Sequence, residues 1–462
     1  MNERRHELFS QPRGRPVGPR GESVPKQPLV TRTHNCATLP LVRVLRRLHV
    51  LDRVAIALLA TGLACVATGL LPTGSASGAM TRIAPLLAFL GTVIVLAELT
   101  SRAEVFDVVA ARIARAGRGS RPLLFLLCVA FASVTTISLN LDTTAVLLTP
   151  VMLALASRVG IAALPLAMTT VWLANTASLL LPVSNLTNLL AADRVALSSL
   201  GLAGRMWAPQ LAAIAVTTAW LWVFFWRPAR RTDAEARRRE RGGPGAVRVG
   251  QEEGPAKAGR YVPPAAHRPA DPVLFRACAL ACGGFLLAIL VADVPLWTAS
   301  ATAAAVAVTA FALRERTALR WSLVPWRLLV MVPGMFLVVE TVTAHGLHGL
   351  LAAAVGDDDG VLGRFRAAAV GAGLSNVLNN LPVYLAGEGA VPVGNHEQLL
   401  ALLIGTNAGP VVTPWASLAT LLWYERCVAH GVRVPLARLV GTGAVLAVTA
   451  VTASVAALAL TR

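Results

Sequence analysis

The stretch "NTASLLLPVSNLTNLLAADR" (residues 175–194) decides the fold, because it places a proline and a run of Ser, Asn and Thr inside an apolar block. The block, residues 161–190, is long enough to cross a bilayer as a helix. A polar interruption of the helix at membrane depth is tolerated only inside protein or beside a water-filled cavity. We therefore expect a helix broken near Pro182, with its polar ends facing the protein interior.

Apolar blocks of similar length make up most of the chain. Of its 462 residues, 55% are hydrophobic and 14% are charged. The blocks are residues 54–71, 83–99, 122–156, 161–190, 209–226, 272–291, 296–313, 328–345, 365–386, 399–424 and 435–460. This pattern predicts an all-α polytopic membrane protein with one membrane domain of about nine to eleven transmembrane helices.

Two blocks do not read as simple spans. Residues 122–156 are interrupted by "SLNLDTT", and residues 365–386 by "LSNVLNNLP". A polar tip between two short apolar arms is typical of a re-entrant hairpin, although each arm could also be a short span. We favour two hairpins and about nine crossings, because this count keeps the arginine-rich loops on one side of the membrane.

The net charge of +18 is concentrated in two segments. Residues 1–53 and 227–271 together hold 22 of the 42 basic residues. Both flank apolar blocks, so the positive-inside rule places both in the cytoplasm of a cell-membrane protein. No aromatic residues interleave these arginines as a nucleic-acid surface requires. We expect a disordered basic tail over residues 1–49 and an arginine-rich linker over residues 227–271, and no nucleic-acid partner.

The two halves of the membrane domain resemble each other. "VLAELTSRAEVFDVVA" (residues 95–110) aligns without a gap with "LVVETVTAHGLHGLLA" (residues 337–352), with Glu98 opposite Glu340. An interrupted hairpin and then an interrupted span follow in each half. The first repeat covers residues 50–226 and the second residues 272–462. The aligned unit begins with residues 83–99, which cross inward, in the first repeat, and with residues 328–345, which cross outward, in the second. Such inverted repeats are typical of secondary transporters.

Four polar clusters mark the candidate site. Each lies beside a proline or glycine, and half-helix ends there would suit an anion or a small hard cation. The alternative is that these residues only form hydrogen bonds between helices. The clusters are "NLDTT" (residues 140–144), "SNLTN" (184–188), "SNVLNN" (375–380) and "TNAGPVVTPWAS" (406–417).

Three carboxylates in or near apolar blocks are candidates for proton coupling. They are Glu98, Asp142 and Glu340. A carboxylate inside a membrane is costly and suggests a proton or ion pathway. Asp142, at a predicted hairpin tip, is the strongest candidate. Glu98 and Glu340 lie near the ends of their spans, where snorkelling or pairing explains them equally well.

Enzyme motifs do not match this sequence. Lysine occurs only at positions 26 and 257, so the chain has no Walker A lysine, and neither "HELFS" nor "HEQLL" carries the second histidine of a zinc-protease helix. The cysteines show no disulfide or zinc-ligand spacing. We therefore expect a transporter without a cofactor or a metal site.

Four motifs carry a family resemblance. "LDTTAVLLTPVMLALASRVG", "NTASLLLPVSNLTNLLAAD", "LSNVLNNLPVYLA" and "GTNAGPVVTPWASLATLLWYE" resemble signature segments of the arsenical-pump membrane permeases. These permeases belong to an ion transporter superfamily with the divalent anion:sodium symporters and some sodium/proton antiporters. The resemblance covers roughly residues 50–460.

The resemblance implies a set of substrate- or ion-binding residues at the two hairpins and the two broken helices. They are Asn140, Asp142, Thr143, Thr144, Ser184, Asn185, Thr187, Asn188, Ser375, Asn376, Asn379, Asn380, Thr406, Asn407, Thr413 and Ser417.

The resemblance also implies the activity, which is efflux of arsenite or antimonite, coupled to proton exchange or to a separate soluble ATPase. Uptake of another small anion such as a dicarboxylate or sulfate, driven by sodium or protons, is the alternative within transport, together with sodium/proton antiport. A membrane subunit that docks an ATPase is the alternative of another class. The sequence leaves the oligomeric state open, with a homodimer as one option.

Overall fold

The computed structural model describes residues 50–227, 261, 267–291 and 294–461. The predicted basic tail and most of the predicted linker lie outside these residues. Within the described ranges the secondary structure is entirely helical. Eight helices there are long and apolar enough to cross a membrane. The all-α membrane architecture expected from the sequence is therefore confirmed.

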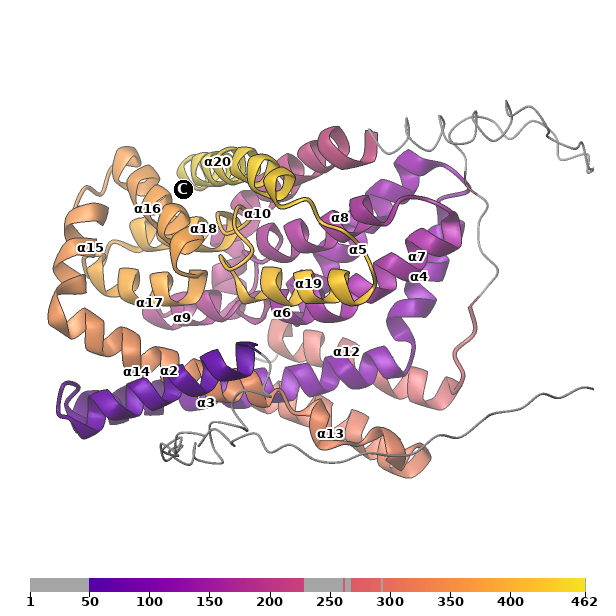
Figure 1. Ribbon diagram of the computed structural model, residues 1–462, viewed down its shortest axis with the longest axis horizontal. Coiled ribbons are helices and arrows are strands. Elements are labelled where there is room, and N and C mark those ends of the chain that lie inside the picture. Colours follow the sequence, from indigo (N-terminus) through magenta and orange to yellow (C-terminus); the bar gives the residue numbers. More distant parts are fainter. Residues whose placement is uncertain (1–49, 228–260, 262–266, 292–293, 462) are drawn as a thin grey trace, which may run out of the picture. The chain divides into compact units, whose positions relative to one another are not determined.

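One group of helices, here called the first layer, lies along the lower side of Figure 1. Its tightest contact is between α2 and α14, where a Cβ atom on Gly334 would lie 2.3 Å from the Leu59 backbone nitrogen. Only glycine allows the two backbones to approach so closely. The layer consists of α2 (Val50–Ala67), α3 (Thr73–Arg102), α12 (Pro272–Val291), α13 (Leu296–Arg314) and α14 (Trp326–Val342).

The first predicted hairpin is a helix that breaks at one residue. Asn140 separates α5 from α6 and has φ 111° and ψ 150°. Helix α4 packs against both α5 and α7, so the two arms begin and end on the same side. The elements are α4 (Val105–Ala116), α5 (Arg121–Leu139), α6 (Leu141–Thr143), the π-helical turn η1 (Thr144–Leu148) and α7 (Thr149–Val159).

The second predicted hairpin repeats this arrangement. The chain breaks at Leu378 and Asn379, between α16 (Val361–Val377) and α17 (Asn380–Ala390). Helix α15 (His348–Val355) packs against both arms, as α4 does in the first half. The breaks expected within "SLNLDTT" and "LSNVLNNLP" are thus present.

The two interrupted spans are each divided into two short helices. In the first, α8 (Ala163–Thr176) is followed by a non-helical segment with the 3₁₀ turn η2 (Pro182–Ser184) and then by α9 (Leu186–Arg194). In the second, α18 (His396–Ala408) and α19 (Leu418–Ala429) flank an irregular loop. The break expected near Pro182 is confirmed.

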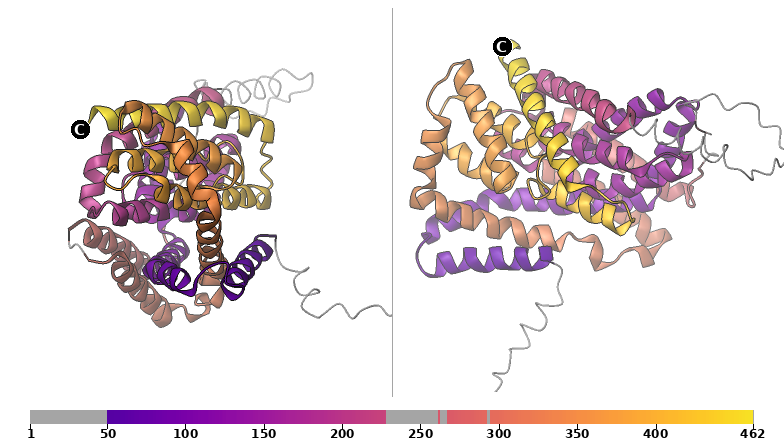
Figure 2. Two further views of the ribbon diagram at one scale, coloured as in Figure 1. Left: turned by 90° about the vertical axis from the view of Figure 1, so that its left-hand side faces the viewer. Right: turned by 45° about the horizontal axis from the view of Figure 1, so that its top comes forward.

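The helices above the first layer in Figure 1 form the second layer, and the left view of Figure 2 shows the two layers one above the other. It comprises α5 to α9, α16 to α19 and the pair α10 (Ser199–Leu221, extended by the π-helical turn η3, Trp222–Trp226) and α20 (Leu436–Leu460). Helices α16 and α18 are in close contact, since a Cβ atom on Gly405 would lie 2.1 Å from the Ala368 carbonyl oxygen. Short turns complete the fold: η4 (Arg316–Ala318), η5 (Trp321–Leu323) and η6 (Thr343–Leu347).

The eight candidate spans are not the same set as the predicted crossings. Both arms of the first hairpin, Arg121–Leu139 and Leu141–Val159, are 19 residues long and qualify by length and hydropathy. The two broken helices do not qualify, because their halves are too short. An apolar block that is broken into two short helices is therefore not among the eight candidate spans.

Candidate functional site

The four helices of the second layer that follow a chain break, α6, α9, α17 and α19, begin at polar capping residues. An N-cap side chain accepts a hydrogen bond from one of the first amides of its helix, which otherwise has no partner. Asn140 accepts from the Asp142 amide (2.7 Å), Asn185 from Thr187 (3.3 Å), Asn379 from Leu381 (3.3 Å) and Ser417 from Thr420 (3.2 Å). The caps belong to α6, α9, α17 and α19.

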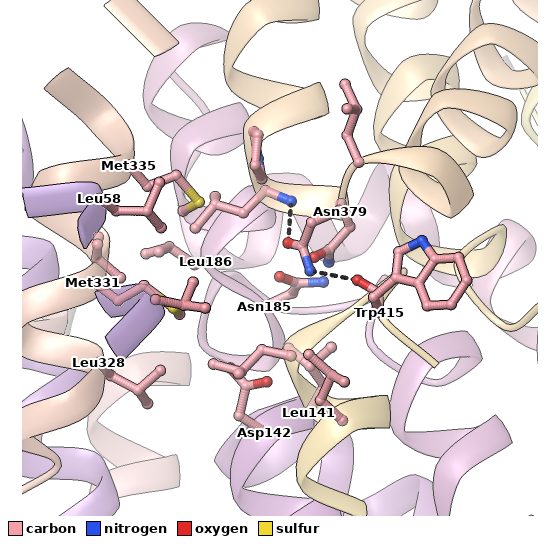
Figure 3. Close-up of a pocket in the computed structure, with 18 of the residues that line it drawn as sticks. Leu58, Leu141, Asp142, Asn185, Leu186, Leu328, Met331, Met335, Asn379 and Trp415 are labelled. Carbon is pink, nitrogen blue, oxygen red and sulfur yellow. Dashed lines mark hydrogen bonds between the residues drawn. The ribbon is translucent and has the colours of Figure 1, made fainter. Parts of the chain in front are cut away.

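The starts of these four helices meet at one cavity of about 390 Å³. Its lining includes Asp142 of α6, Asn185 before α9, Asn380 of α17 and Leu418 of α19. The opposite wall is apolar and comes from the first layer, with Leu58, Leu328, Met331 and Met335 (Figure 3). The cavity thus lies between the two layers.

The polar part of the cavity has an unused donor and a carboxylate. The Asn185 Nδ2 atom is buried and has no hydrogen-bond partner in the described part of the chain. The neighbouring Asn379 Nδ2 donates to the Trp415 carbonyl oxygen at 3.0 Å (Figure 3). Among the described residues that line the cavity, Asp142 is the ionisable one. A ligand with hydroxyl groups could accept from Asn185 and donate to Asp142.

A second cavity, of about 520 Å³, adjoins the first. Asp142, Leu328 and Leu418 line both. The second cavity is charged, because its lining also includes Asp52, Glu98, Arg102, Arg327 and Arg426. Asp142 therefore lies at the boundary between an apolar-walled cavity and a charged vestibule.

Three of the predicted site residues form a buried network between the halves. Thr187 Oγ1 donates to Asn407 Oδ1 at 2.6 Å, and Asn407 Nδ2 donates to Asn188 Oδ1 at 2.7 Å. Asn188 Nδ2 in turn donates to the Ser178 and Leu181 carbonyl oxygens. These side chains hold the two broken helices together and do not line the cavity.

The loop between α18 and α19 is fixed by another predicted residue. Asn376 donates to the Gly409 carbonyl oxygen at 2.9 Å and accepts from the amides of Val412 and Thr413. Thr413 Oγ1 donates back to the Asn376 carbonyl oxygen at 2.8 Å. Asn376 therefore has a structural part in shaping the loop that leads to Ser417.

The remaining predicted residues are placed as follows. Ser184 donates to the Ile137 carbonyl oxygen, and Thr144 and Thr406 donate to carbonyl oxygens of their own helices. The hydroxyls of Thr143 and Ser375 are buried without a partner among the described residues. Glu98 pairs with Arg102 at 3.2 Å, and Glu340 is exposed on α14. Of the full predicted set, the structure brings Asp142, Asn185, Asn379 and Asn380 to the first cavity, and Thr143 and Glu98 to the second.

Sequence reasoning missed the apolar wall of the site. Met331 and Met335 are one helical turn apart on α14 and face the cavity, and Trp415 is also among the lining residues. Apolar residues that face a cavity look the same in sequence as those that face lipid. Trp415 carried a usable signal, since it lies inside the interrupted stretch "TNAGPVVTPWAS".

The described residues include no group of three or more His, Cys, Asp or Glu that could hold a metal ion. The chemistry available at the cavity is therefore that of one carboxylate, amide groups and the ends of four helices. Helix N-termini carry partial positive charge, which favours anions and polarised oxygen atoms.

A helical membrane domain with a polar site at the meeting point of broken helices defines the class of secondary transporters. Comparison with known proteins agrees with this class. The chain belongs to the family described as Citrate transporter, whose model matches residues 43–419.

Curated relatives carry a narrower name. An arsenical pump membrane protein of Yersinia enterocolitica is 30% identical over 391 residues, covering 80% of this chain and 84% of the relative. Two Escherichia coli proteins of the same name are 29% and 28% identical over the same shares of both chains. Among solved structures, the Alcanivorax borkumensis YdaH transporter matches 84% of this chain and 87% of its own, with a TM-score of 0.47 and 16% identity.

Proposed function

We propose that this protein exports arsenite or antimonite across the cell membrane in exchange for protons. The observation that carries the proposal is the composition of the first cavity, which combines the Asp142 carboxylate and the unpartnered Asn185 amide with an apolar wall. The name shared by the curated relatives supports the same substrate.

The described residues that line the first cavity include no cationic side chain. This composition favours a neutral substrate over citrate. A citrate anion carries several negative charges, and burying them without a counter-ion is costly. Arsenous acid is uncharged at neutral pH and carries three hydroxyl groups. These hydroxyls can donate to the Asp142 carboxylate and accept from Asn185 Nδ2, so both of these groups find a partner.

Asp142 is the proposed proton carrier. It lines both cavities, so it can exchange protons with the charged vestibule and also contact a substrate in the first cavity. An ionised carboxylate is costly inside a membrane, and protonation removes that cost when no substrate is bound. In this scheme the substrate and the proton compete for Asp142.

The proposed topology follows the duplication. The two helix pairs that break at Asn140 and at Leu378 and Asn379 are re-entrant hairpins of inverted orientation, with the N-terminus in the cytoplasm. Two features support this arrangement: α4 and α15 each pack against both arms of their hairpin, and α2 and α14 run in parallel.

Transport in everted membrane vesicles tests the proposal. We expect vesicles that contain the protein to accumulate antimonite when their interior is acidified, and accumulation to stop when an uncoupler collapses the pH gradient. Cells that lack their own efflux system should also gain arsenite resistance. A well-expressed protein that gives neither result would exclude this substrate assignment.

Sodium-coupled uptake of a small anion is the second candidate. The four helix N-termini at the cavity favour it, because their partial positive charges suit an anion even without arginine. Proteoliposomes distinguish the two functions: uptake of citrate or sulfate that depends on sodium and resists an uncoupler supports the second.

Deleting residues 228–260 tests whether arsenite resistance requires a soluble ATPase that docks on this protein.

A further inference from the structure

Arg82 and Arg327, two arginines of the first layer, lie at opposite ends of the site. Arg82 and Arg102 are both on α3, and the 20 residues between them correspond to about 30 Å of helix. Arg102 lines the charged vestibule together with Arg327 of α14. Arg327 therefore lies at the vestibule end of the first layer, and Arg82 lies at the other end.

Arg82 connects the two layers tightly. Its Nη1 atom donates to Glu388 Oε1 of α17 at 2.7 Å, and its Nε atom lies 4.0 Å from Asp193 Oδ2 of α9. The Glu388 side chain is 7% exposed, and its other oxygen is buried without a hydrogen-bond partner among the described residues. Separating this pair would leave a buried charge, which is strongly unfavourable.

Arg327 connects the two layers loosely. Its short hydrogen bond, 2.7 Å from Nε to Oδ1, is to Asp52 of α2, which belongs to the same layer. Its contact with the second layer is longer, 3.8 Å from Nη1 to Glu425 Oε2 of α19. The charged vestibule lies beside this arginine. Of these two ion pairs between the layers, the one at the Arg82 end is therefore the shorter, at 2.7 Å against 3.8 Å at the vestibule end.

The partners on the broken helices occupy equivalent positions. Asp193 is the eighth residue after the cap Asn185 of α9, and Glu425 is the eighth residue after the cap Ser417 of α19. Each capped helix therefore leads from the cavity to a carboxylate that faces an arginine of the first layer. The duplication has placed one such contact at each end.

We propose that Arg82 and Arg327 form two latches between the layers, and that they close in alternation during transport. In the structure the Arg82 latch is closed, with Arg82 Nη1 2.7 Å from Glu388 Oε1, and the Arg327 latch is longer, with Arg327 Nη1 3.8 Å from Glu425 Oε2. In the opposite state Arg327 exchanges Asp52 for Glu425, and Arg82 releases Glu388. This proposal rests on the proposed transport function, since a carrier must expose its site to the two sides in turn.

Cysteine labelling of the full-length protein in detergent tests the latches. One reporter, Leu422→Cys, lies in the vestibule, and a second, Leu189→Cys, lies in a separate cavity beside Arg82. A water-soluble maleimide labels each reporter, and peptide mass spectrometry measures each rate, so the six native cysteines can remain. The readout needs no substrate, so it is independent of the arsenite assignment.

Glu388→Gln opens the Arg82 latch by removing the charge that Arg82 holds. We expect labelling of Leu422→Cys to become slower and labelling of Leu189→Cys to become faster, each by about tenfold, the equilibrium effect of one charge-assisted hydrogen bond. Glu425→Gln removes the partner of the other latch and should change both rates in the opposite directions.

The matched control is an ion pair that lies within one layer. Arg314 donates to Asp271 at 2.9 Å, next to α12 and α13 of the first layer. Arg314→Gln should leave both labelling rates unchanged. Unchanged labelling rates in Glu388→Gln would overturn the proposal, because they would mean that the Arg82 contact does not control access to the vestibule. Faster labelling at both reporters would also overturn it, because it would mean that the whole structure had become looser. If Glu388→Gln does not fold, Arg82→Lys provides the milder variant, with the same expected directions.

Discussion

The two halves of the molecule build the same framework and give it different chemistry. In the first half, Asn140 and Asn185 cap α6 and α9, Asp142 lies two residues after Asn140, and the Asn185 Nδ2 donor has no partner among the described residues. In the second half, Asn379 and Ser417 cap α17 and α19, but the Asn379 Nδ2 atom already donates a hydrogen bond to the Trp415 carbonyl oxygen. Duplication thus supplies the geometry of the site, while the first half supplies its carboxylate, Asp142.

The largest effect should come from Asp142→Asn. The variant keeps the size of the side chain but cannot carry a proton, so we expect antimonite accumulation in acidified vesicles to fall to the level of empty vesicles. Asn380→Asp, which puts an acid into the second half, should not restore transport to this variant, because its carboxylate does not line the vestibule. Full activity of Asp142→Asn would remove the chemical difference between the halves.

The hairpin caps should differ in their contribution to stability. Asn140→Ala loses a cap and also forces alanine to adopt φ 111°, so it should lower the free energy of unfolding by about 2 to 3 kcal/mol. Asn379→Ala loses the cap and the Trp415 contact and should cost about 1 to 2 kcal/mol. Thermal unfolding in detergent measures both. Asn140→Gly should be milder than Asn140→Ala, and the reverse order would contradict the backbone explanation.

Asn185→Ser makes the first half resemble the second. Serine keeps the cap of α9 but removes the free Nδ2 donor, so stability should be retained while substrate affinity falls by about three- to tenfold, the effect of one hydrogen bond. Binding is measured by the substrate concentration that raises the melting temperature. Ser417→Ala is the counterpart, and it should lower stability with little effect on affinity.

The smallest effects should come from the aligned pair Glu98 and Glu340. Glu98 lines the vestibule and pairs with Arg102, so Glu98→Gln should change the transport rate by no more than about threefold, as partly exposed ion pairs contribute little. Glu340→Gln should have no measurable effect, because Glu340 is exposed on α14 outside both cavities. An equal loss in both variants would mean that the halves share a coupling role at this position.

The framework could be read from the sequence because its signals are local. Proline and polar residues inside apolar blocks predicted all four helix breaks, including those at Pro182 and Asn140. The cavity was only partly predictable. Asn188 and Asn376 lie beside the same breaks as Asn185 and Asn379, yet their amide groups donate to carbonyl oxygens of the non-helical segments next to them. Which polar side chain faces the cavity depends on packing between segments far apart in the chain.

The contacts between the two layers could not be predicted from the sequence either, because they join residues that are far apart in the chain. Arg82 and Glu388 are 306 residues apart, and neither belongs to a recognisable motif. The apolar wall around Met331 has the composition of any membrane-facing helix surface. Sequence therefore predicted the elements that carry the site, whereas the surface that closes it required the structure.

Two close glycine contacts between helices also have a mechanical consequence. Gly334 brings α14 against α2 within the first layer, and Gly405 brings α18 against α16 within the second. Backbones in direct contact interlock and resist sliding, whereas side chains that meet across a plane can shift past one another. Each layer is therefore stiff in itself, and the plane of easiest shear in the molecule coincides with the cavity where a substrate would sit.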